Sequence, residues 1–453
     1  MPLWMPQAIM PSDGGGVALY PHPPPPLPDP SLCSGRERGR FPPPHPSPFT
    51  GEGVERGARR EGYMAMRPSN VRRRTMPELI PYTLRFHSGL HLGTRGVNLE
   101  EAGVSLPADT LFAALLDVWR RTGGDAADLA APFTAAPPDP PFLLTSAFPY
   151  AGEVRFYPLP LNLTALFSAE ILRQRSKDIK RIRYISEALL RKALRGERLD
   201  DDLFPATNEE AEPQRGLALQ GGNLWLTVEE AAHLPAGLQP ESGRWRALRY
   251  LALWSVERVP RVTVSRITSA STIFHAGRVS FAAGCGLWFG LAWRRPERQV
   301  GAGALTFRQA FEQALALLQH EGLGGERTAG YGAFTFEQGE AFTLPDPVPG
   351  RPALLLSRYH PRQEELPQAL VAKDTAYDLV GVAGWLRSPD GRAQRRKRLI
   401  LVAEGSLVHP PAFPAGDITD VRPEYNGTPG VPHPVYRYGL AFLVNWPQEV
   451  DHA

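Results

Sequence analysis

The sequence is poor in the residues from which covalent frameworks and metal sites are built. Its only cysteines, Cys33 and Cys285, give neither a disulfide framework nor a paired-cysteine zinc pattern. The motifs HExxH, GxSxG and CxxC are also absent, which removes the common signatures of metal and nucleophile chemistry. We therefore expect no catalytic residues, no metal and no cofactor, in a protein of a reducing compartment, the cytoplasm.

Long apolar runs are absent as well. No run approaches the roughly 20 residues that a membrane-spanning helix needs. The opening segment, MPLWMPQAIM, lacks the charged region and the continuous apolar stretch of a secretory signal. The sequence thus predicts that the protein has no membrane partner.

Charge of one sign is not in large excess, because 50 Lys and Arg face 47 Asp and Glu, for a net charge of +3. At this balance the whole chain carries no strong electrostatic signature of a nucleic-acid binder. Arginine nevertheless greatly outnumbers lysine, and the planar guanidinium can pair with phosphate and stack on a base. A GC-rich genome would produce the same bias, so composition leaves the ligand open.

Proline is abundant, above all in residues 1–75, which include PHPPPPLPDP and FPPPHPSPF. Proline at this density blocks both helices and sheet ladders. We expect either a disordered Pro/Arg-rich tail or a start codon assigned too far upstream, because MPELIPYTLRF, from Met76, reads as a natural beginning.

Hydrophobic periodicity predicts two cycles of strand, helix and strand, followed by three further strands. The first cycle is expected at 79–87, 108–124 and 142–150, the second at 279–293, 306–322 and 331–338, and the further strands at 353–359, 377–386 and 397–408. The last two strands are joined by the turn signal SPDGR, residues 388–392. This succession predicts an α+β protein with tandem ferredoxin-like (RRM-like, βαββαβ) domains at 76–255 and 256–453.

A basic segment, Arg173 to Arg195, lies inside the first of these domains and reads as a helix with cations on several faces. The cations there that could contact an anionic ligand are Lys177, Lys180, Arg181 and Arg183. A solvated surface helix or linker would explain the charges equally well.

A glycine-rich loop, GLGGERTAGYGAF, occupies residues 322–334 between an expected helix and an expected strand. Glycines allow a backbone or an anion to come close, and their free N–H groups can cradle phosphate. Walker and Rossmann loops follow a strand and open a helix, so the reversed order here excludes both nucleotide readings. An ordinary helix-to-strand turn is the alternative. The candidate RNA-binding residues in this loop are Gly324, Gly325, Arg327, Gly330, Tyr331 and Gly332.

Residues 256–281, VERVPRVTVSRITSASTIFHAGRVSF, read as a long hairpin with a break at SAS and a tip that stands off the body of the protein. Its arginines could contact phosphates while an apolar side chain stacks or wedges between bases. A plain surface hairpin with charged outer positions is the alternative. The candidate residues here are Arg258, Arg261, Arg266, Phe274 and Arg278.

Two histidines, His87 and His91, lie in FHSGLHLG. Imidazole titrates near neutrality, so an acid-base pair for RNA cleavage is conceivable, although a role in shaping the loop or touching RNA fits better. We include His87 among the candidate RNA contacts. Asp109 precedes an apolar helix and is predicted to be its N-cap.

In order along the chain, FHSGLHLG, SLPADTLFAALLDVW, KDIKRIRYIS, RVTVSRITSASTIFHAGRVSF with GLWFGL, and GGERTAGYGAF resemble the RAMP superfamily of CRISPR-associated proteins. Within it they are similar to the fourth subunits of type III-A (Csm) effector complexes. The ordered set covers most of Met76 to Trp446, whereas glycine-rich loops alone are common to all RAMP subunits.

This resemblance implies tandem ferredoxin-like folds that hold the 5′ tag of the guide RNA (crRNA). It also implies a protruding β-hairpin thumb that kinks the guide, carried onto Arg261 to Phe274. The partners would be the large polymerase-like CRISPR subunit and a backbone RAMP subunit of the Csm complex.

The resulting hypothesis is a noncatalytic crRNA-binding subunit that acts in antiviral defence. A Cas6-like crRNA-processing endoribonuclease that uses His87 or His91, or the equivalent RAMP subunit of a type III-B complex, are the alternatives.

Overall fold

The structure, a computed structural model, describes residues 78–93, 102–205, 216–239, 248–386 and 394–448. They lie in one compact unit, Arg72–Ala453. Residues 1–75 and the expected turn at 388–392 fall outside the described ranges. No helix within the described ranges is long and apolar enough to cross a membrane.

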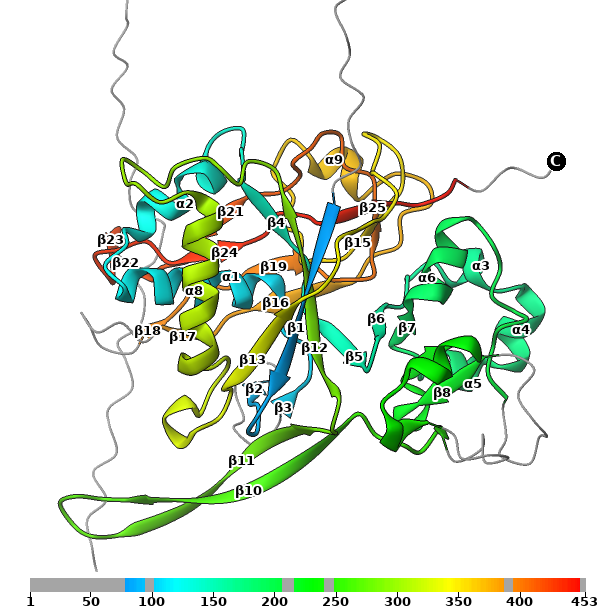
Figure 1. Cartoon of the computed structure of the whole chain (residues 1–453). Coiled ribbons are helices and arrows are strands. Elements are labelled where there is room, and N and C mark those ends of the chain that lie inside the picture. Colours follow the sequence, from blue (N-terminus) through cyan, green and yellow to red (C-terminus); the bar gives the residue numbers. More distant parts are fainter. Residues whose placement is uncertain (1–77, 94–101, 206–215, 240–247, 387–393, 449–453) are drawn as a thin grey trace, which may run out of the picture. The chain divides into compact units, whose positions relative to one another are not determined.

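The largest sheet of the described chain has ten strands (Figure 1). They are β1 (Glu78–Phe86), β4 (Phe142–Leu144), β5 (Phe148–Ala151), β6 (Val154–Pro158), β7 (Tyr184–Ser186), β8 (Leu217–Leu219), β9 (Leu224–Leu226), β12 (Cys285–Trp293), β13 (Phe334–Gln338) and β14 (Phe342–Thr343). The path runs β13-β1-β12-β5-β6-β7-β9-β8, with β4 beside β12 and β14 beside β1. The sheet is mixed because β7 and β9 run parallel whereas β1 and β12 run antiparallel.

Two long helices, α1 (Ala108–Arg121) and α8 (Phe307–Glu321), connect four strands of this sheet. The chain order is β1-α1-β4 and then β12-α8-β13, and the sheet order is β13-β1-β12-β4 with every neighbouring pair antiparallel. This is a βαββαβ succession whose two βαβ halves come from either side of residue 255. The α+β class expected from the sequence is confirmed.

Strand β12 is an inner strand of the large sheet, and side chains on both of its faces are buried. Leu287 and Phe289 pack into a core formed with α1 and α8, whereas Trp288 points into a second core formed with the helical insertion. The alternation follows from the two-residue period of a strand. On the first face the rings of Tyr82 and Phe289, which are register partners, stack with centroids 5.2 Å apart.

The strand expected at 142–150 is divided into β4 and β5 by Thr145 and Ser146. Both residues are fully buried, and their hydroxyl groups accept hydrogen bonds from backbone amides. The Thr145 hydroxyl accepts from the Gly290 amide at 2.8 Å, and the Ser146 hydroxyl accepts from the Ala108 amide at 3.0 Å. The strand expected at 279–293 is likewise interrupted before β12, at Gly284, where φ is +74°. The helices expected at 108–124 and 306–322 are confirmed as α1 and α8.

The predicted N-cap at Asp109 is wrong. Pro107 occupies the N-cap position of α1, and Ser146 supplies the hydroxyl that accepts from its first amide. Asp109 is instead fully buried in the first turn, where it forms ion pairs with Arg437 and, at 3.4 Å, with Arg358. A buried carboxylate needs such partners, and they come from a distant part of the chain that local sequence does not reveal.

The single basic helix expected over residues 173–195 is also wrong. The insertion contains α3 (Leu163–Leu166), α4 (Ala169–Gln174), α5 (Ser176–Ile179), strand β7 and α6 (Glu187–Leu194). Ile182 and Ile185 are buried in the second core, and β7 pairs with β6 and β9. Sheet pairing and burial of the apolar residues between the cations therefore override helix propensity.

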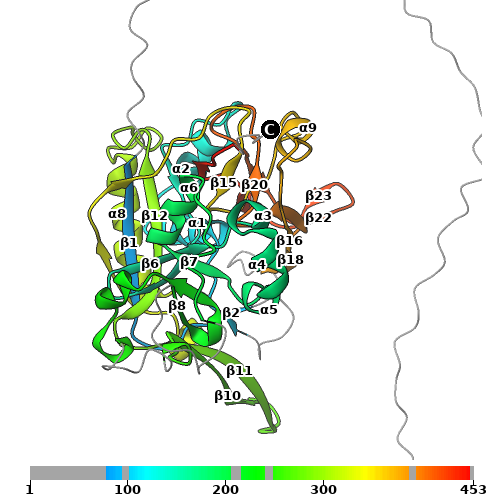
Figure 2. The same cartoon turned by 90° about the vertical axis from the view of Figure 1, so that its right-hand side faces the viewer.

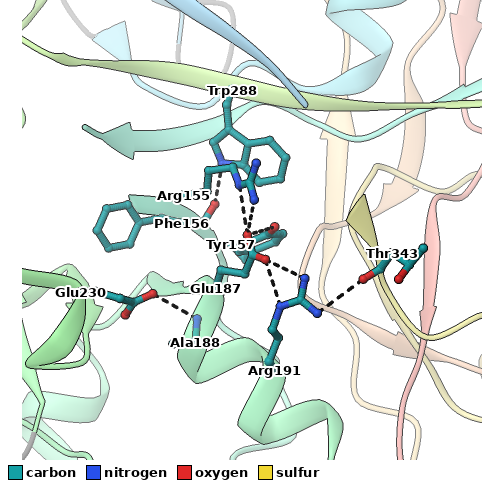
Figure 3. A network of polar contacts seen from close by, with 9 residues as sticks. All are labelled: Arg155, Phe156, Tyr157, Glu187, Ala188, Arg191, Glu230, Trp288 and Thr343. Carbon is teal, nitrogen blue, oxygen red and sulfur yellow. Dashed lines mark hydrogen bonds and ion pairs between the residues drawn. The ribbon is translucent and has the colours of Figure 1, made fainter. Parts of the chain in front are cut away.

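A network around Glu187 connects α6 to β6 and to the central sheet (Figure 3). The Glu187 carboxylate accepts from Arg155 and from Arg191, each at 2.7 Å, and from the Tyr157 hydroxyl at 3.2 Å. The Arg155 guanidinium also lies 5.6 Å from the Trp288 ring centroid. Burial by itself would raise the pKa of Glu187, but the two guanidinium groups outweigh it and hold that pKa below its usual value.

The rest of the insertion forms a third apolar cluster beneath β8 and β9, which includes Leu217, Leu224 and Leu253. Its short helices are η1 (Gln220–Gly222), η2 (Glu229–His233) and η3 (Ala236–Leu238). Elsewhere α2 (Ala126–Thr134) follows α1, and β2 (Leu92–Gly93) pairs with β3 (Ala102–Gly103).

The C-terminal part has its own small sheet, β20-β15-β25, and an apolar cluster that includes Leu355 and Tyr359. Ring contact between Phe112 of α1 and Tyr438, at 5.1 Å, joins it to the first core. Its elements are β15 (Ala353–Leu355), α9 (Leu366–Ala369), β16 (Leu379–Val382), β17 (Trp385–Leu386), β18 (Gln394–Arg395), β19 (Leu399–Val402), β20 (Leu407–Val408), β21 (Ile418–Asp420), β22 (Glu424–Tyr425), β23 (Thr428–Pro429), β24 (Tyr436–Tyr438) and β25 (Leu443–Asn445).

Candidate nucleic-acid interface

The hairpin expected from residues 256–281 is present as β10 (Trp254–Val264) and β11 (Ser271–Phe281), which pair along their whole length. Both views show it standing off the rest of the described unit (Figures 1 and 2). The turn is closed by the Ser265 hydroxyl, which accepts from the amides of Ile267 and Thr268. Ile267 at the tip is 96% exposed and Ile273 is 67% exposed, so the hairpin presents apolar side chains to solvent.

The candidate residues of the hairpin occupy different positions along it. Arg266 lies exposed in the tip, and Arg261 pairs in register with the half-buried Phe274, so the two side chains share a face. Nearer the root, Arg278 forms an ion pair with Glu257 at 2.5 Å, and this hydrogen bond raises the pKa of Arg278. Arg258 is the register partner of Gly277.

The glycine-rich loop packs against the root of this hairpin through the segment 88–91. Leu90 bridges Val279 of β11, with two backbone hydrogen bonds of 2.8 Å. On the other side, the Gly332 amide donates to the Gly89 carbonyl at 2.9 Å, and the Gly325 amide donates to the His91 carbonyl at 2.8 Å. Three segments far apart in sequence therefore meet at one junction.

Tyr331 lies at the centre of this junction and is only 7% exposed. The Arg261 guanidinium lies 5.0 Å from the centroid of its ring, and Tyr331 adds to the effect of Glu257 in raising the pKa of Arg278. Tyr331 therefore holds Arg261 beside the loop through a cation–π contact. The ring itself is not presented to solvent.

The structure separates the glycines of the loop into two kinds. A Cβ on Gly324 would overlap the carbonyl oxygen of His91, a Cβ on Gly332 would overlap that of Leu323, and one on Gly325 would lie 2.8 Å from the His91 ring. These three glycines let other parts of the protein pack closely against the loop. Gly330, with φ at +82°, has no atom within 4 Å of the Cβ position and is exposed.

Helix η4 (Arg327–Ala329) carries the remaining loop candidate, Arg327, which is exposed. The turn ends at Gly330, whose carbonyl accepts from the Ser88 hydroxyl at 2.6 Å. Arg327 and Gly330 therefore lie on the solvent side of the junction.

The histidines do not share an environment. His91 is 5% exposed, and its Nδ1 lies 2.8 Å from the Gly277 carbonyl of β11, so it joins the loop to the hairpin. His87 is exposed, and its amide donates to the Ala333 carbonyl at 3.1 Å. Burial and a backbone partner make His91 a structural residue of the junction.

The four basic candidates of the insertion, Lys177, Lys180, Arg181 and Arg183, lie on α5 and on the segment that leads to β7. All four side chains are exposed. Two neighbouring arginines have other partners: Arg175 and Arg249 both pair with Asp178, at 3.1 and 3.0 Å. The insertion thus presents a cationic surface of its own.

Sequence reasoning missed two features. Gly89 was not singled out, although a Cβ there would overlap the Arg278 side chain at the junction. Residues 377–408 were read only as two strands, whereas their outer part is an exposed ribbon that carries Trp385. The signal that pointed to the ribbon is QRRKR at 394–398, directly after the expected turn.

Comparison with known proteins adds two findings. Residues 349–446 match the family model of the CRISPR Csm4 C-terminal domain. The fold is similar to a chain in the crystal structure of the Csm3-Csm4 subcomplex in the type III-A CRISPR-Cas interference complex, with a TM-score of 0.52 and 14% identity over 82% of this chain and 100% of that chain.

Two further structures are similar at lower scores. A chain of the Csm1-Csm4 cassette in complex with pppApA has a TM-score of 0.45 and 18% identity over 82% of this chain and 98% of that one. A chain of the type III-B Cmr-beta complex bound to cognate target RNA has a TM-score of 0.35 and 10% identity, over 72% and 86% of the two chains. No curated protein sequence gives a significant match.

Residues 349–446 therefore carry a Csm4-type C-terminal domain. The fold of the described chain, a mixed sheet with two paired helices, is similar to that of a chain in the Csm3-Csm4 subcomplex. The resemblance of the sequence motifs to the fourth Csm subunits thus has a counterpart in the C-terminal part of the chain.

Proposed function

We propose that this chain is an RNA-binding subunit of a type III-A CRISPR effector complex and that it holds the 5′ tag of the crRNA. The observation that carries this proposal is the junction of the hairpin and the glycine-rich loop. It places Arg261 and Arg278 beside Tyr331, with the exposed Arg327 and Gly330 on the neighbouring turn. Arginines around the open turn at Gly330 suit the phosphates of a single strand.

The hairpin β10–β11 would act as the thumb of this subunit. Its exposed apolar residues Val262, Ile267 and Ile273, with Arg266 at the tip, have the chemistry needed to wedge between bases and hold the adjacent phosphate. Phe274 and Arg258 would support it along the ribbon, and His87 would contact RNA where the loop meets β1. The cations of the insertion, Lys177, Lys180, Arg181 and Arg183, would add electrostatic contacts.

The partners would be a large polymerase-like subunit and a backbone RAMP subunit. The similar structure of a Csm3-Csm4 subcomplex supports the second of these, and the Csm4-type C-terminal domain supports assignment to type III-A rather than III-B. We also propose a tandem organisation, 76–255 and 256–453, in which the halves share the large sheet through β1 and β12. The separate apolar cluster of the C-terminal part supports a second packing unit there.

The subunit would be noncatalytic. His91, one of two histidines considered for RNA cleavage, is buried against the hairpin backbone, which supports a binding role over a Cas6-like one. Incubation of the full chain with repeat RNA in EDTA tests this, because specific cleavage abolished by His87→Ala would replace the binding role with a processing enzyme.

The direct test of RNA binding uses full-length protein and a fluorescein-labelled RNA that carries the 5′ tag, at moderate salt. Arg327→Ala and Arg266→Ala should each weaken binding and lower the salt dependence by about one phosphate contact. The matched control is Arg351→Ala, an exposed arginine outside the hairpin and the loop. If both variants bind as the wild type does, the assignment of the junction to RNA is wrong.

A further inference from the structure

A second antiparallel ribbon projects from the C-terminal part (Figure 1). It begins with β16 and β19, in which Gly381 pairs with Ile400, and it continues outward with β17 and β18, in which Trp385 pairs with Arg395. Trp385 is 53% exposed and Ile400 is 55% exposed. Exposed large apolar residues gathered on one ribbon are a feature of binding surfaces.

An arginine caps the exposed tryptophan. The Arg395 guanidinium lies 5.3 Å from the centroid of the Trp385 ring. The Arg396 guanidinium donates to the Trp385 carbonyl at 3.2 Å, and the Arg396 amide donates to the Gly384 carbonyl at 3.0 Å. Hydrogen bonds therefore fix the backbone at Trp385, and the Arg395 cation covers its ring. About half of the surface of Trp385 stays exposed to solvent.

Two cations of this ribbon have no acidic partner in the described part of the chain. Glu424, an acid near the ribbon, pairs with Lys397 at 2.6 Å. Arg395 and Arg398 form no ion pair with any described carboxylate, and Arg395 is exposed. The side chain of Arg398 extends across Gly381, where a Cβ would lie 2.8 Å from its Nη2. The outer ribbon thus carries uncompensated positive charge next to an aromatic ring.

Cations also gather around Arg396. Burial, followed by the nearby Arg437 guanidinium, lowers the pKa of Arg396 to about 10, although Asp109 opposes this. Asp109 is already shared by Arg437 and Arg358. An anion that approached Arg396 from outside would therefore be attracted by several cations at once.

We propose that this second ribbon is an additional contact for single-stranded RNA, with Trp385 stacking on a base while Arg395 and Arg398 pair with the flanking phosphates. The inference rests on the proposed function and extends it to a surface outside the hairpin and the loop. An aromatic platform interleaved with cations is the chemistry by which proteins hold unpaired nucleotides. A surface that binds another protein usually has fewer unpaired cations than this ribbon has. The reason is that charged residues are depleted at the centre of protein interfaces.

The test measures the affinity of full-length protein for the fluorescein-labelled tag RNA by fluorescence anisotropy over a range of salt concentrations. Trp385→Ala should raise Kd by about 5-fold or more, and Trp385→Phe, which keeps an aromatic face, should raise it less. Arg395→Ala combined with Arg398→Ala should reduce the slope of log K against log salt by about 0.7 for each phosphate that the protein no longer neutralises. Tyr250→Ala, an aromatic that is 67% exposed on another segment, is the control.

The outcomes separate this inference from the proposed function. If Arg327→Ala and Arg266→Ala weaken binding but the ribbon variants do not, the second contact is refuted and the proposed function stands. If the wild-type protein does not bind the tag RNA, both fail. Unchanged RNA affinity with weaker binding to the large CRISPR subunit would make the ribbon a protein-binding surface and would also refute the proposal. Unchanged circular dichroism and urea midpoints must accompany any decrease in affinity that counts as support.

Discussion

Two glycines of the loop with the same backbone angle should respond very differently to the same substitution. Gly330 and Gly332 both have φ at +82°, a conformation that costs alanine about 1 kcal/mol. At Gly330 nothing lies within 4 Å of the new Cβ, so Gly330→Ala should cost about that amount and no more. At Gly332 the Cβ would overlap the Leu323 carbonyl, and the backbone must move.

The movement at Gly332 would disturb two backbone hydrogen bonds, both of 2.9 Å. In one, the Gly332 amide donates to the Gly89 carbonyl; in the other, the Leu323 amide donates to the Gly332 carbonyl. At about 1 kcal/mol each, their removal brings the cost of Gly332→Ala to about 3 kcal/mol. Urea unfolding monitored by circular dichroism measures the difference as a shift in midpoint multiplied by the slope of the transition. Equal destabilisation by the two variants would show that the loop does not pack closely against Leu323 and Gly89 at this position.

The same pair tests what the glycines are for. If phosphate approaches the turn at Gly330, Gly330→Ala should weaken binding of tag RNA at nearly wild-type stability, because the new methyl group points into the open space. A variant whose affinity falls only in proportion to its stability would argue against direct RNA binding there.

Asp109, Glu187 and Arg261 each give a further expected result. Asp109→Asn should destabilise the protein by about 3–5 kcal/mol in urea unfolding, because Arg437 would remain buried without its anion; a cost below about 1 kcal/mol would contradict this. The lowered pKa of Glu187 stabilises the fold above its unfolded pKa, and this contribution disappears as pH falls through the folded value. Glu187→Gln should therefore flatten the fall of the urea midpoint below about pH 4.5, and an unchanged acid limb would count against the network. Arg261→Ala should cost only about 0.5–1 kcal/mol of stability, because it removes the cation–π interaction with Tyr331, while lowering RNA affinity; a wild-type Kd would remove it from the interface.

Local pattern was sufficient for the two long helices and for the outline of the hairpin. The helices α1 and α8 follow from apolar spacing, and a capping box at Thr306 with Gln309 marks the start of α8 within the sequence itself. The hairpin follows from two β-branched runs around a short polar break, because pairing partners there are close in sequence.

The basic segment and Asp109 were misread for the same reason. Charge and propensity favour a helix over residues 173–195, but the pairing of β7 with β9 decides its structure, and β9 lies about 40 residues further along the chain. Likewise, a helix-start position suggested a cap at Asp109, but Arg437, more than 300 residues away, determines its role. In both cases the deciding partner is distant in sequence, and its contribution exceeds any local preference.

The sequence by itself determined that this is an α+β protein with a glycine-rich loop between a helix and a strand and with arginines spread along a hairpin. Only the tertiary structure decided which of those residues face solvent. The Cβ sides of Gly324, Gly325 and Gly332 are occupied by the protein, whereas that of Gly330 is open. This distinction depends on backbone atoms from segments 88–91 and 322–323, which chain folding brings within contact distance and no local pattern encodes.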